Sequence, residues 1–298
     1  YLACWMFMAA TGLLILELCL RMPPGANLVS LARGFLGKPG EIAAWGLYLF
    51  LFYSLSVAYL SGAGGLLQGW LGASLPHWGG ILLFFSLSAP FVYIGAKAVD
   101  RLNSAFMAGL LISYFIFVAV ALPHVQFAPL ARVDWGKSLT ALPIIFTSFS
   151  YQGIIPTLTS YLQRDAKRLR LSILLGTGIT FLIYVLWEFL ILGVIPVEGE
   201  MGLAQTKVLG LTAVAPLRIY VAHAWVATTG QFFAFFAIAT SFLGVTLGLA
   251  DFLADGLKIA KRGRGRLQIA LLTFIPPLVV ALFYPALFLK ALGFAGGI

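Results

Sequence analysis

Charged residues are scarce in this chain of 298 residues. Only 10% are charged, 61% are hydrophobic, and the mean hydropathy is +1.00. A soluble domain has about 25% charged and about 45–50% apolar residues. The scarcity of charge therefore excludes an ordinary soluble globular protein and predicts an integral membrane protein.

Residues that perform metal and nucleophilic chemistry are also few. The chain has 3 His and 2 Cys. The histidines His77, His124 and His223 fall in three separate segments without ligand spacing, and neither HExxH nor GxSxG occurs. Cys4 and Cys19 share one predicted helix at a separation of about 22 Å, too far for a mutual disulfide. We expect no cofactor, no metal site and no enzymatic activity.

Long apolar runs are what the sequence has in abundance. Hydrocarbon offers no partner to an unpaired backbone group, so runs of about 20 apolar residues predict helical spans. The ten-residue alternation of a membrane barrel is not seen. We expect an all-α, polytopic protein with a single transmembrane domain over residues 1–298. The eight expected full spans lie near 1–22, 42–68, 79–97, 104–123, 139–161, 171–195, 223–253 and 267–285, and a partial span begins at 286.

The 19 basic residues predict the topology. Fourteen of them lie in alternate loops, within 21–38, 97–101, 164–170 and 258–266, and four lie in the loops on the other side. Positive residues stay on the cytoplasmic side, so residue 1 starts near the outer face. The formal charge of +9 therefore reflects orientation in a lipid bilayer, and we expect no nucleic-acid partner.

One expected span is unusually polar. The stretch IIFTSFSYQGIIPTL, residues 144–158, combines hydroxyl, aromatic and amide side chains with Gly153 and Pro156. Glycine and proline weaken the helical ladder, and broken helices of this kind bind substrate near the midplane of secondary transporters. The alternative is a kinked helix whose hydroxyls bond back to their own turn, which suffices for any single Ser or Thr. The whole cluster favours a binding site formed by Ser148, Phe149, Ser150, Tyr151, Gln152 and Gly153.

Two acidic residues lie deeper in predicted spans than the others. Glu17 precedes Arg21 by four residues, which offers an ordinary helical ion pair as an explanation. Glu188 lies in YVLWEFLIL without a basic residue within one turn. An ionisable group inside a span is a functional hypothesis by default, and Glu188 is the harder of the two to explain as structure.

Two further polar groups occur in spans. Thr240 and Ser241 adjoin in an otherwise apolar span, where paired hydroxyls either help to hold a cation or supply hydrogen bonds at a close helix contact. Tyr53 lies in the second expected span, where it either reaches a central cavity or packs. The residues alone leave both pairs of alternatives open.

The strings PIIFTSFSYQGIIPTL, AYLSGAGGLL, ATSFLGVTLGLADFLAD and RLQIALLTFIPPLVVALFYP resemble the bacterial tyrosine-specific permeases of the hydroxy and aromatic amino acid permease family. The resemblance runs along essentially the whole chain. It implies a bacterial inner-membrane transporter with the five-plus-five inverted-repeat fold, truncated here so that the first family helix is missing. It also implies import of aromatic amino acid, most simply tyrosine, by proton symport. Without its first helix the chain is expected to transport weakly or not at all.

The resemblance assigns expected roles to residues. Phe149 to Gly153 would line the substrate pocket, Tyr53 would face it, and Thr240 with Ser241 would occupy the place where sodium-coupled relatives hold an ion. The family pattern has His at Gln152 and Gln at Glu188, so one titratable group is lost and another gained. We therefore expect Glu188, with Glu17 as the other acid, to take part in proton coupling.

Several alternatives stay open at this point. Sodium is the alternative coupling ion, and tryptophan or serine and threonine are rival substrates. A helical membrane receptor or scaffold that does not transport is the alternative outside the transporters. The sequence does not define the oligomeric state.

Overall fold

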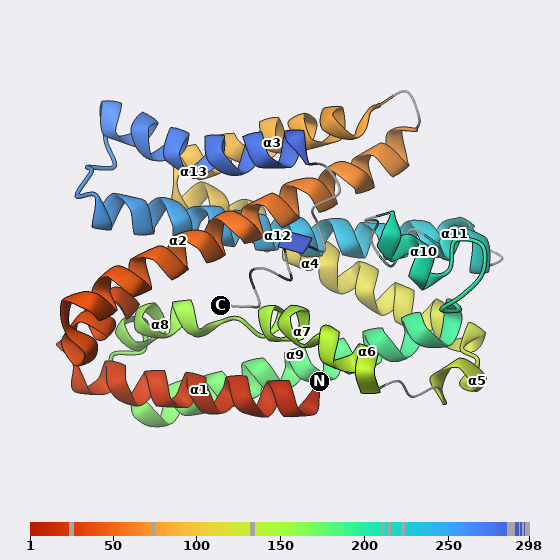
Figure 1. Ribbon diagram of the computed structural model, residues 1–298, viewed down its shortest axis with the longest axis horizontal. Coiled ribbons are helices and arrows are strands. Elements are labelled where there is room, and N and C mark those ends of the chain that lie inside the picture. The colour runs from red at the N-terminus through yellow and green to blue at the C-terminus, as the bar shows by residue number, and fades with distance from the viewer. Residues whose placement is uncertain are drawn as a thin grey trace. The chain divides into compact units, whose positions relative to one another are not determined.

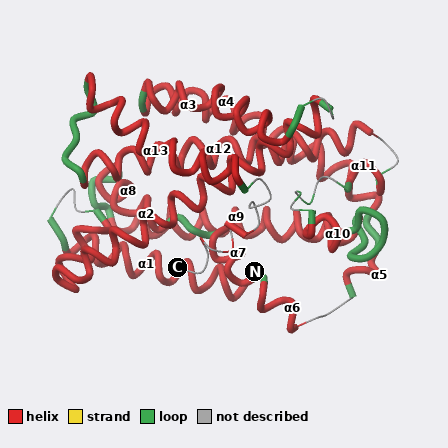
Figure 2. The backbone as a smooth tube through the Cα atoms, turned by 45° about the horizontal axis from the view of Figure 1, so that its top comes forward, coloured by secondary structure: helices red, strands yellow, loops and turns green. Residues whose placement is uncertain are grey.

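The computed structural model describes residues 1–23, 27–72, 75–131, 135–209, 211, 213, 216–221, 224–284, 290–291, 293 and 295. All regular structure in these residues is helical, as Figure 2 shows by colour. Seven helical segments in this part of the chain are long and apolar enough to cross a membrane. The prediction of an all-α, multi-pass membrane protein is confirmed.

The long helices account for most of the expected spans. They are α1 (Leu2–Arg21), α2 (Leu28–Leu71), α3 (His77–Ile94), α4 (Ala96–Ala121), α9 (Ala166–Val194), α12 (Ala224–Gly256) and α13 (Gly263–Phe283). The expected span near 139–161 is divided between two short helices, α7 (Leu142–Ser148) and α8 (Ile155–Tyr161). The expected partial span from 286 falls largely outside the described residues.

Short helices connect the long ones (Figure 1). They are the 3₁₀ turns η1 (Leu122–His124) and η2 (Gln152–Ile154) and the helices α5 (Phe127–Leu130), α6 (Trp135–Thr140), α10 (Leu203–Val208) and α11 (Leu217–Tyr220). The longest helix, α2, changes direction at Gly37, whose φ of 69° lies in the left-handed region. Glycine reaches that region without a steric cost, and Pro39 follows it. The part of α2 that follows this change of direction contains the span expected near 42–68.

Contacts divide the chain into two compact units. The first unit comprises Tyr1–Leu51, Asp134–Glu188 and Gly293–Ile298, and the second comprises Phe52–Val133 and Phe189–Leu292. The expectation of a single transporter domain over 1–298 stays a prediction, and the two units are described one at a time.

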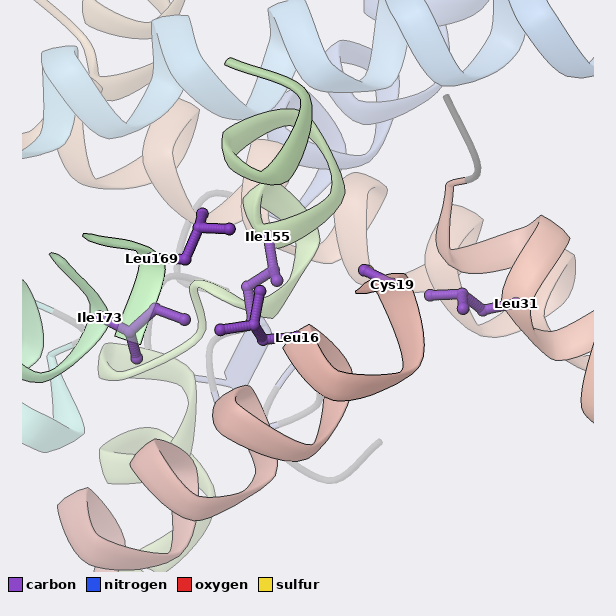
Figure 3. Packing of buried hydrophobic residues seen from close by; sticks show 6 residues of the cluster. All are labelled: Leu16, Cys19, Leu31, Ile155, Leu169 and Ile173. Atoms are coloured by element: carbon purple, nitrogen blue, oxygen red, sulfur yellow. The ribbon is translucent and has the colours of Figure 1, made fainter. Parts of the chain in front are cut away.

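The first unit is held together by apolar side chains from α1, α2, α8 and α9. Leu16 and Ile155 are fully buried in this cluster, which also contains Cys19, Leu31, Leu169 and Ile173 (Figure 3). Further along α1, Trp5 stacks on Phe181 with ring centroids 5.3 Å apart, and its indole N–H donates to Thr177 Oγ1 at 3.2 Å. In a bilayer, such close packing and interhelical hydrogen bonds drive helix association. They fix α9 beside α1.

The second unit is built around α12, which packs along α4 and also contacts α3 and α13. Its core is aromatic, with Phe84, Phe117 and Phe242 fully buried. Close helix contacts are possible because of small residues: a Cβ at Gly109 of α4 would lie 2.7 Å from the ring of Phe236 on α12. The shared packing holds these four helices as one body.

Candidate functional site

The polar stretch singled out in the sequence is an interruption between two helices. Helix α7 ends at Ser148 and α8 begins at Ile155, and the ribbon that links them in Figure 1 is not continuous α-helix, because only the 3₁₀ turn η2 lies between them. In place of the i to i−4 ladder, the amides of Phe149 and Ser150 bond to carbonyls three residues back. Pro156 lies in the first turn of α8, where its missing N–H costs no helical bond. The helix break predicted from Gly153 and Pro156 is present.

Gln152 stabilises the broken backbone and ties it to α1. Its Oε1 accepts a hydrogen bond from the Tyr151 amide at 3.0 Å. Its Nε2 donates to the Met8 carbonyl at 3.4 Å and to Thr11 Oγ1 at 3.3 Å. Both ends of the side-chain amide are thus used in contacts within the protein. The structure supports a positioning role for Gln152 more directly than contact with a ligand.

Tyr151 makes a second link to α1. Its hydroxyl donates to the Met8 carbonyl at 3.1 Å. The ring lies directly over Gly12, because a Cβ built there would come within 2.0 Å of the Tyr151 hydroxyl oxygen. Glycine at position 12 is therefore what allows the tyrosine to reach α1.

Phe149 is the centre of an aromatic cluster. The residue is buried, and its ring centroid lies 5.3 Å from that of Tyr184 and 6.4 Å from that of Tyr1. Tyr184, on α9, also donates its hydroxyl proton to the Ser148 carbonyl at 3.0 Å. The end of α7 is thereby attached to α9 through a backbone group and an aromatic contact.

Glu188 lies on the same face of α9 as Tyr184, one turn further along. It is partly buried, and its Oε2 accepts a hydrogen bond from the Tyr1 hydroxyl at 3.3 Å. The structure therefore joins Phe149 and Glu188, two residues selected from the sequence, through Tyr1 and Tyr184. The result is one group of aromatic rings with a carboxyl at its edge.

The small residues of the break differ in their hydrogen bonds and in the space around them. The Ser148 hydroxyl donates to the Ile144 carbonyl one turn back at 2.9 Å, as the kinked-helix alternative requires. Ser150 and Gly153 are exposed, and the nearest atom to a Cβ at Gly153 would be Tyr48 Cε1 at 4.0 Å. Ser150 and Gly153 thus offer polar groups and open backbone that a small molecule can approach.

Glu17 is explained by a different partner from the one expected. Its carboxylate forms an ion pair with Arg170 on α9. The carboxylate thus reaches across to the neighbouring helix α9, an ordinary ion pair of a different kind from the one that Arg21 offers within α1. Both side chains of the observed pair are substantially exposed, which is typical of an interfacial ion pair.

Tyr53, Thr240 and Ser241 belong to the second unit. The Tyr53 hydroxyl donates to the Leu272 carbonyl of α13 at 2.7 Å. Thr240 donates to the Phe236 and Ala237 carbonyls of its own helix at 2.9 and 3.1 Å. Ser241 is partly buried on α12. These contacts favour the packing alternative for Tyr53 and Thr240, and the proposed ligand and ion roles of all three stay predictions.

Within the described ranges, no three His, Cys, Asp or Glu side chains are grouped so that they could hold a metal ion. The candidate site therefore consists of hydroxyls, amides, aromatic rings and one carboxyl.

Tyr184, Met8 and Thr11 were missed by reasoning from the sequence. Tyr184 could have been found, because it precedes Glu188 by four residues and so shares its helix face. The carbonyl of Met8 and the hydroxyl of Thr11 carry no such signal. Their role depends on how α1 is rotated against the break.

Comparison with known proteins gives a consistent result. The model of the tryptophan/tyrosine permease family matches residues 1–298. Tyrosine-specific transport system 1 of Haemophilus influenzae is 36% identical over 299 residues, which cover 99% of this chain and 74% of that protein. The tryptophan-specific transport protein of Pseudomonas aeruginosa is 35% identical, covering 99% of this chain and 73% of that protein. A tyrosine permease of Enterobacter agglomerans is 26% identical over 97% of this chain and 73% of its own length.

Proposed function

Because the chain belongs to the tryptophan/tyrosine permease family, we propose that it imports tyrosine by proton symport across the inner membrane of a bacterium. Its relatives are named as transport proteins and permeases, so the protein is a multi-pass membrane transporter rather than an enzyme. The observation that carries the proposal for the site is the interruption between α7 and α8 beside a cluster of aromatic rings.

The interruption has the chemistry that a free amino acid needs. An amino acid zwitterion presents an ammonium group, which requires acceptors, and a carboxylate, which requires donors. Exposed Ser150 and Gly153 provide hydroxyl and backbone groups of both kinds at the break. Phe149 and Tyr184 lie beside them, and aromatic pairs of edge-to-face geometry add favourable interaction beyond area burial. We therefore assign the substrate's polar end to the break and its ring to the aromatic cluster.

Glu188 is the residue to which we assign proton coupling. Its carboxyl lies on a membrane-spanning helix, and the Tyr1 hydroxyl donates to it. A carboxyl there binds and releases a proton next to the aromatic cluster. Its charge therefore changes the binding free energy of a substrate that contacts Phe149 and Tyr184. Glu17, by contrast, pairs with the basic side chain of Arg170. This difference favours Glu188 over Glu17 as the coupling acid, with sodium as the alternative coupling ion.

Tryptophan is the second candidate substrate. The support for it is that relatives of nearly equal identity, 36% and 35%, are named as tyrosine-specific and tryptophan-specific. The aromatic cluster is compatible with either ring.

Competition in proteoliposomes tests these assignments. Labelled tyrosine uptake should be saturable, blocked by unlabelled tyrosine and insensitive to serine. Stronger inhibition by tryptophan than by tyrosine would reverse the assigned substrate, and equal inhibition by serine would contradict an aromatic site. If the chain, extended to the full length of the relatives of which it matches about three quarters (74% of one of them), is correctly inserted and shows no uptake, a receptor or scaffold is favoured.

A variant pair tests the place of the site. Gly153→Leu should raise the KM for tyrosine at least about tenfold, because it fills the open backbone that the substrate approaches. Gly176→Leu, at a position of α9 where no atom lies within 4 Å of an added Cβ, should leave the KM unchanged. An unchanged KM in Gly153→Leu would show that the substrate does not bind at the interruption between α7 and α8.

A further inference from the structure

The second unit contains a cavity at the end where the basic loops meet. Its volume is about 510 Å³, and it lies between the end of α3, the start of α4, the last turns of α12 and the first turns of α13. None of the residues proposed for transport lines it. These helix ends adjoin the basic segments 97–101 and 258–266, which the distribution of positive charge assigns to the cytoplasmic side. The cavity therefore shares no residue with the candidate site of the first unit.

The mouth of this cavity is positively charged. Lys97, Lys261 and Arg266 line it, opposed by a single acid, Asp251. Lys261 Nζ lies 2.8 Å from Asp251 Oδ1, so this pair is neutral overall. Lys97 and Arg266 remain as the surplus of positive charge, which favours an anionic ligand.

The wall of the cavity is amphipathic. Arg266 lies over the ring of Tyr93, with Cζ 5.8 Å from the ring centroid, and this contact holds the guanidinium at the mouth. Val92, Ile94, Leu247 and Phe274 supply apolar surface, and Ile94 is 61% exposed. A small hydrophilic anion would leave this apolar wall without a partner. An amphiphile with a charged head satisfies both parts.

A buried hydroxyl in the cavity also lacks a partner. Thr273 is fully buried and lines the cavity, and its Oγ1 has no hydrogen-bond partner within the described chain. Other threonines in these helices, such as Thr246, bond to the carbonyl one turn back. An unsatisfied buried hydroxyl is costly, and a ligand oxygen is a partner that would remove this cost. On α13, Thr273 lies two turns beyond Arg266, about 10 Å deeper into the helix.

We propose that this cavity binds one anionic phospholipid from the cytoplasmic leaflet. The phosphate lies at Lys97 and Arg266, the ester region faces Thr273 Oγ1, and an acyl chain follows the apolar wall. Basic pockets between membrane helices on the cytoplasmic side recognise anionic headgroups in this way. The charge complementarity and the amphipathic wall together select a lipid over a soluble anion.

Native mass spectrometry of the full chain, titrated with phosphatidylglycerol or phosphatidylcholine, tests the proposal. One phosphatidylglycerol should bind more tightly than the others and at least about tenfold more tightly than phosphatidylcholine. The Lys97→Gln/Arg266→Gln variant should lose this preference. The matched control, Arg262→Gln/Arg264→Gln, removes two exposed charges at the start of α13 that lie outside the cavity, and should keep the preference.

One further variant and one competition experiment complete the test. Thr273→Val preserves shape but removes the hydroxyl, and it should weaken phosphatidylglycerol binding about fivefold while the thermal unfolding midpoint is retained. Inorganic phosphate in excess should not displace the lipid. Equal losses in both charge variants would show only a general attraction of the basic loop, and displacement by phosphate would show a soluble-anion site; either result overturns the proposal.

Discussion

Gly12 shows how one residue determines the geometry of the candidate site. The Tyr151 hydroxyl lies where a side chain at position 12 would begin. In the sequence, Gly12 is one of 32 glycines, and nothing in its neighbourhood distinguishes it. The constraint becomes visible only when the broken helix is placed against α1.

Gly12→Ala should therefore destabilise the protein. An added Cβ would lie 2.0 Å from Tyr151 Oη, so the ring must move and its bond to the Met8 carbonyl is lost. We expect a loss of about 1–3 kcal/mol in the free energy of unfolding, measured by thermal unfolding in detergent. Tyr151→Phe in the same chain should restore part of this loss, because it removes the closest atom.

Gly46→Ala is the control for this substitution. It lies in the same unit, and no atom lies within 4 Å of an added Cβ. Its unfolding midpoint should stay at or slightly above that of the unsubstituted protein. If both alanine variants unfolded at the same temperature, the contact between Tyr151 and Gly12 would not exist in solution.

Glu17 gives a second prediction at this scale. Its ion pair with Arg170 involves side chains that are 42% and 55% exposed, and exposed pairs contribute about 0–1 kcal/mol. Glu17→Gln should accordingly lower stability by less than about 1 kcal/mol and leave the dependence of tyrosine uptake on a pH gradient unchanged. If the Glu17→Gln variant lost that dependence, the result would indicate that Glu17 takes part in proton coupling.

Among the elements, α7 and α8 show what the sequence makes predictable. Gly153 and Pro156 lie in a span-length apolar run, and backbone chemistry alone predicts a break there. The residues that surround the break come from α1 and α9, more than 30 residues away along the chain. Their selection depends on helix rotation and packing, which hydropathy does not encode.

Tyr53 illustrates the same limit in the other unit. Its polar tip in an apolar helix suggested either a cavity or packing. The carbonyl of Leu272, 219 positions further along the chain, accepts its hydrogen bond. No local pattern near Tyr53 points to that partner, which favours packing, and a role of Tyr53 in substrate binding stays a prediction.

The contact between α2 and α3 leads to a prediction at the scale of elements. A Cβ at Gly80 would lie 2.4 Å from the Gly64 carbonyl oxygen. A backbone atom cannot rotate away as a side chain can, so Gly80→Ala should force the helices apart and cost about 1–3 kcal/mol in the free energy of unfolding. Gly69→Ala on α2, with no atom within 4 Å, should be tolerated. Similar unfolding midpoints for the two variants would contradict the close crossing.

At the scale of the whole molecule, composition and hydropathy predicted most of what the structure and the comparisons confirm. The all-α, multi-pass architecture follows from long apolar runs with few charges. The family follows from extended strings such as PIIFTSFSYQGIIPTL, and the match of the family model to residues 1–298 confirms it. Composition and hydropathy do not predict the discrimination between tyrosine and tryptophan, because it depends on a few contacts around the substrate ring.

Our central proposal is that Glu188 couples proton movement to amino acid import. The most direct measurement is labelled tyrosine uptake into proteoliposomes with and without an imposed pH gradient, comparing the protein with Glu188→Gln and the exposed control Glu198→Gln. We expect the gradient to accelerate uptake in the protein and in Glu198→Gln but not in Glu188→Gln, which should still exchange tyrosine. Gradient-driven uptake that persists in Glu188→Gln would contradict it.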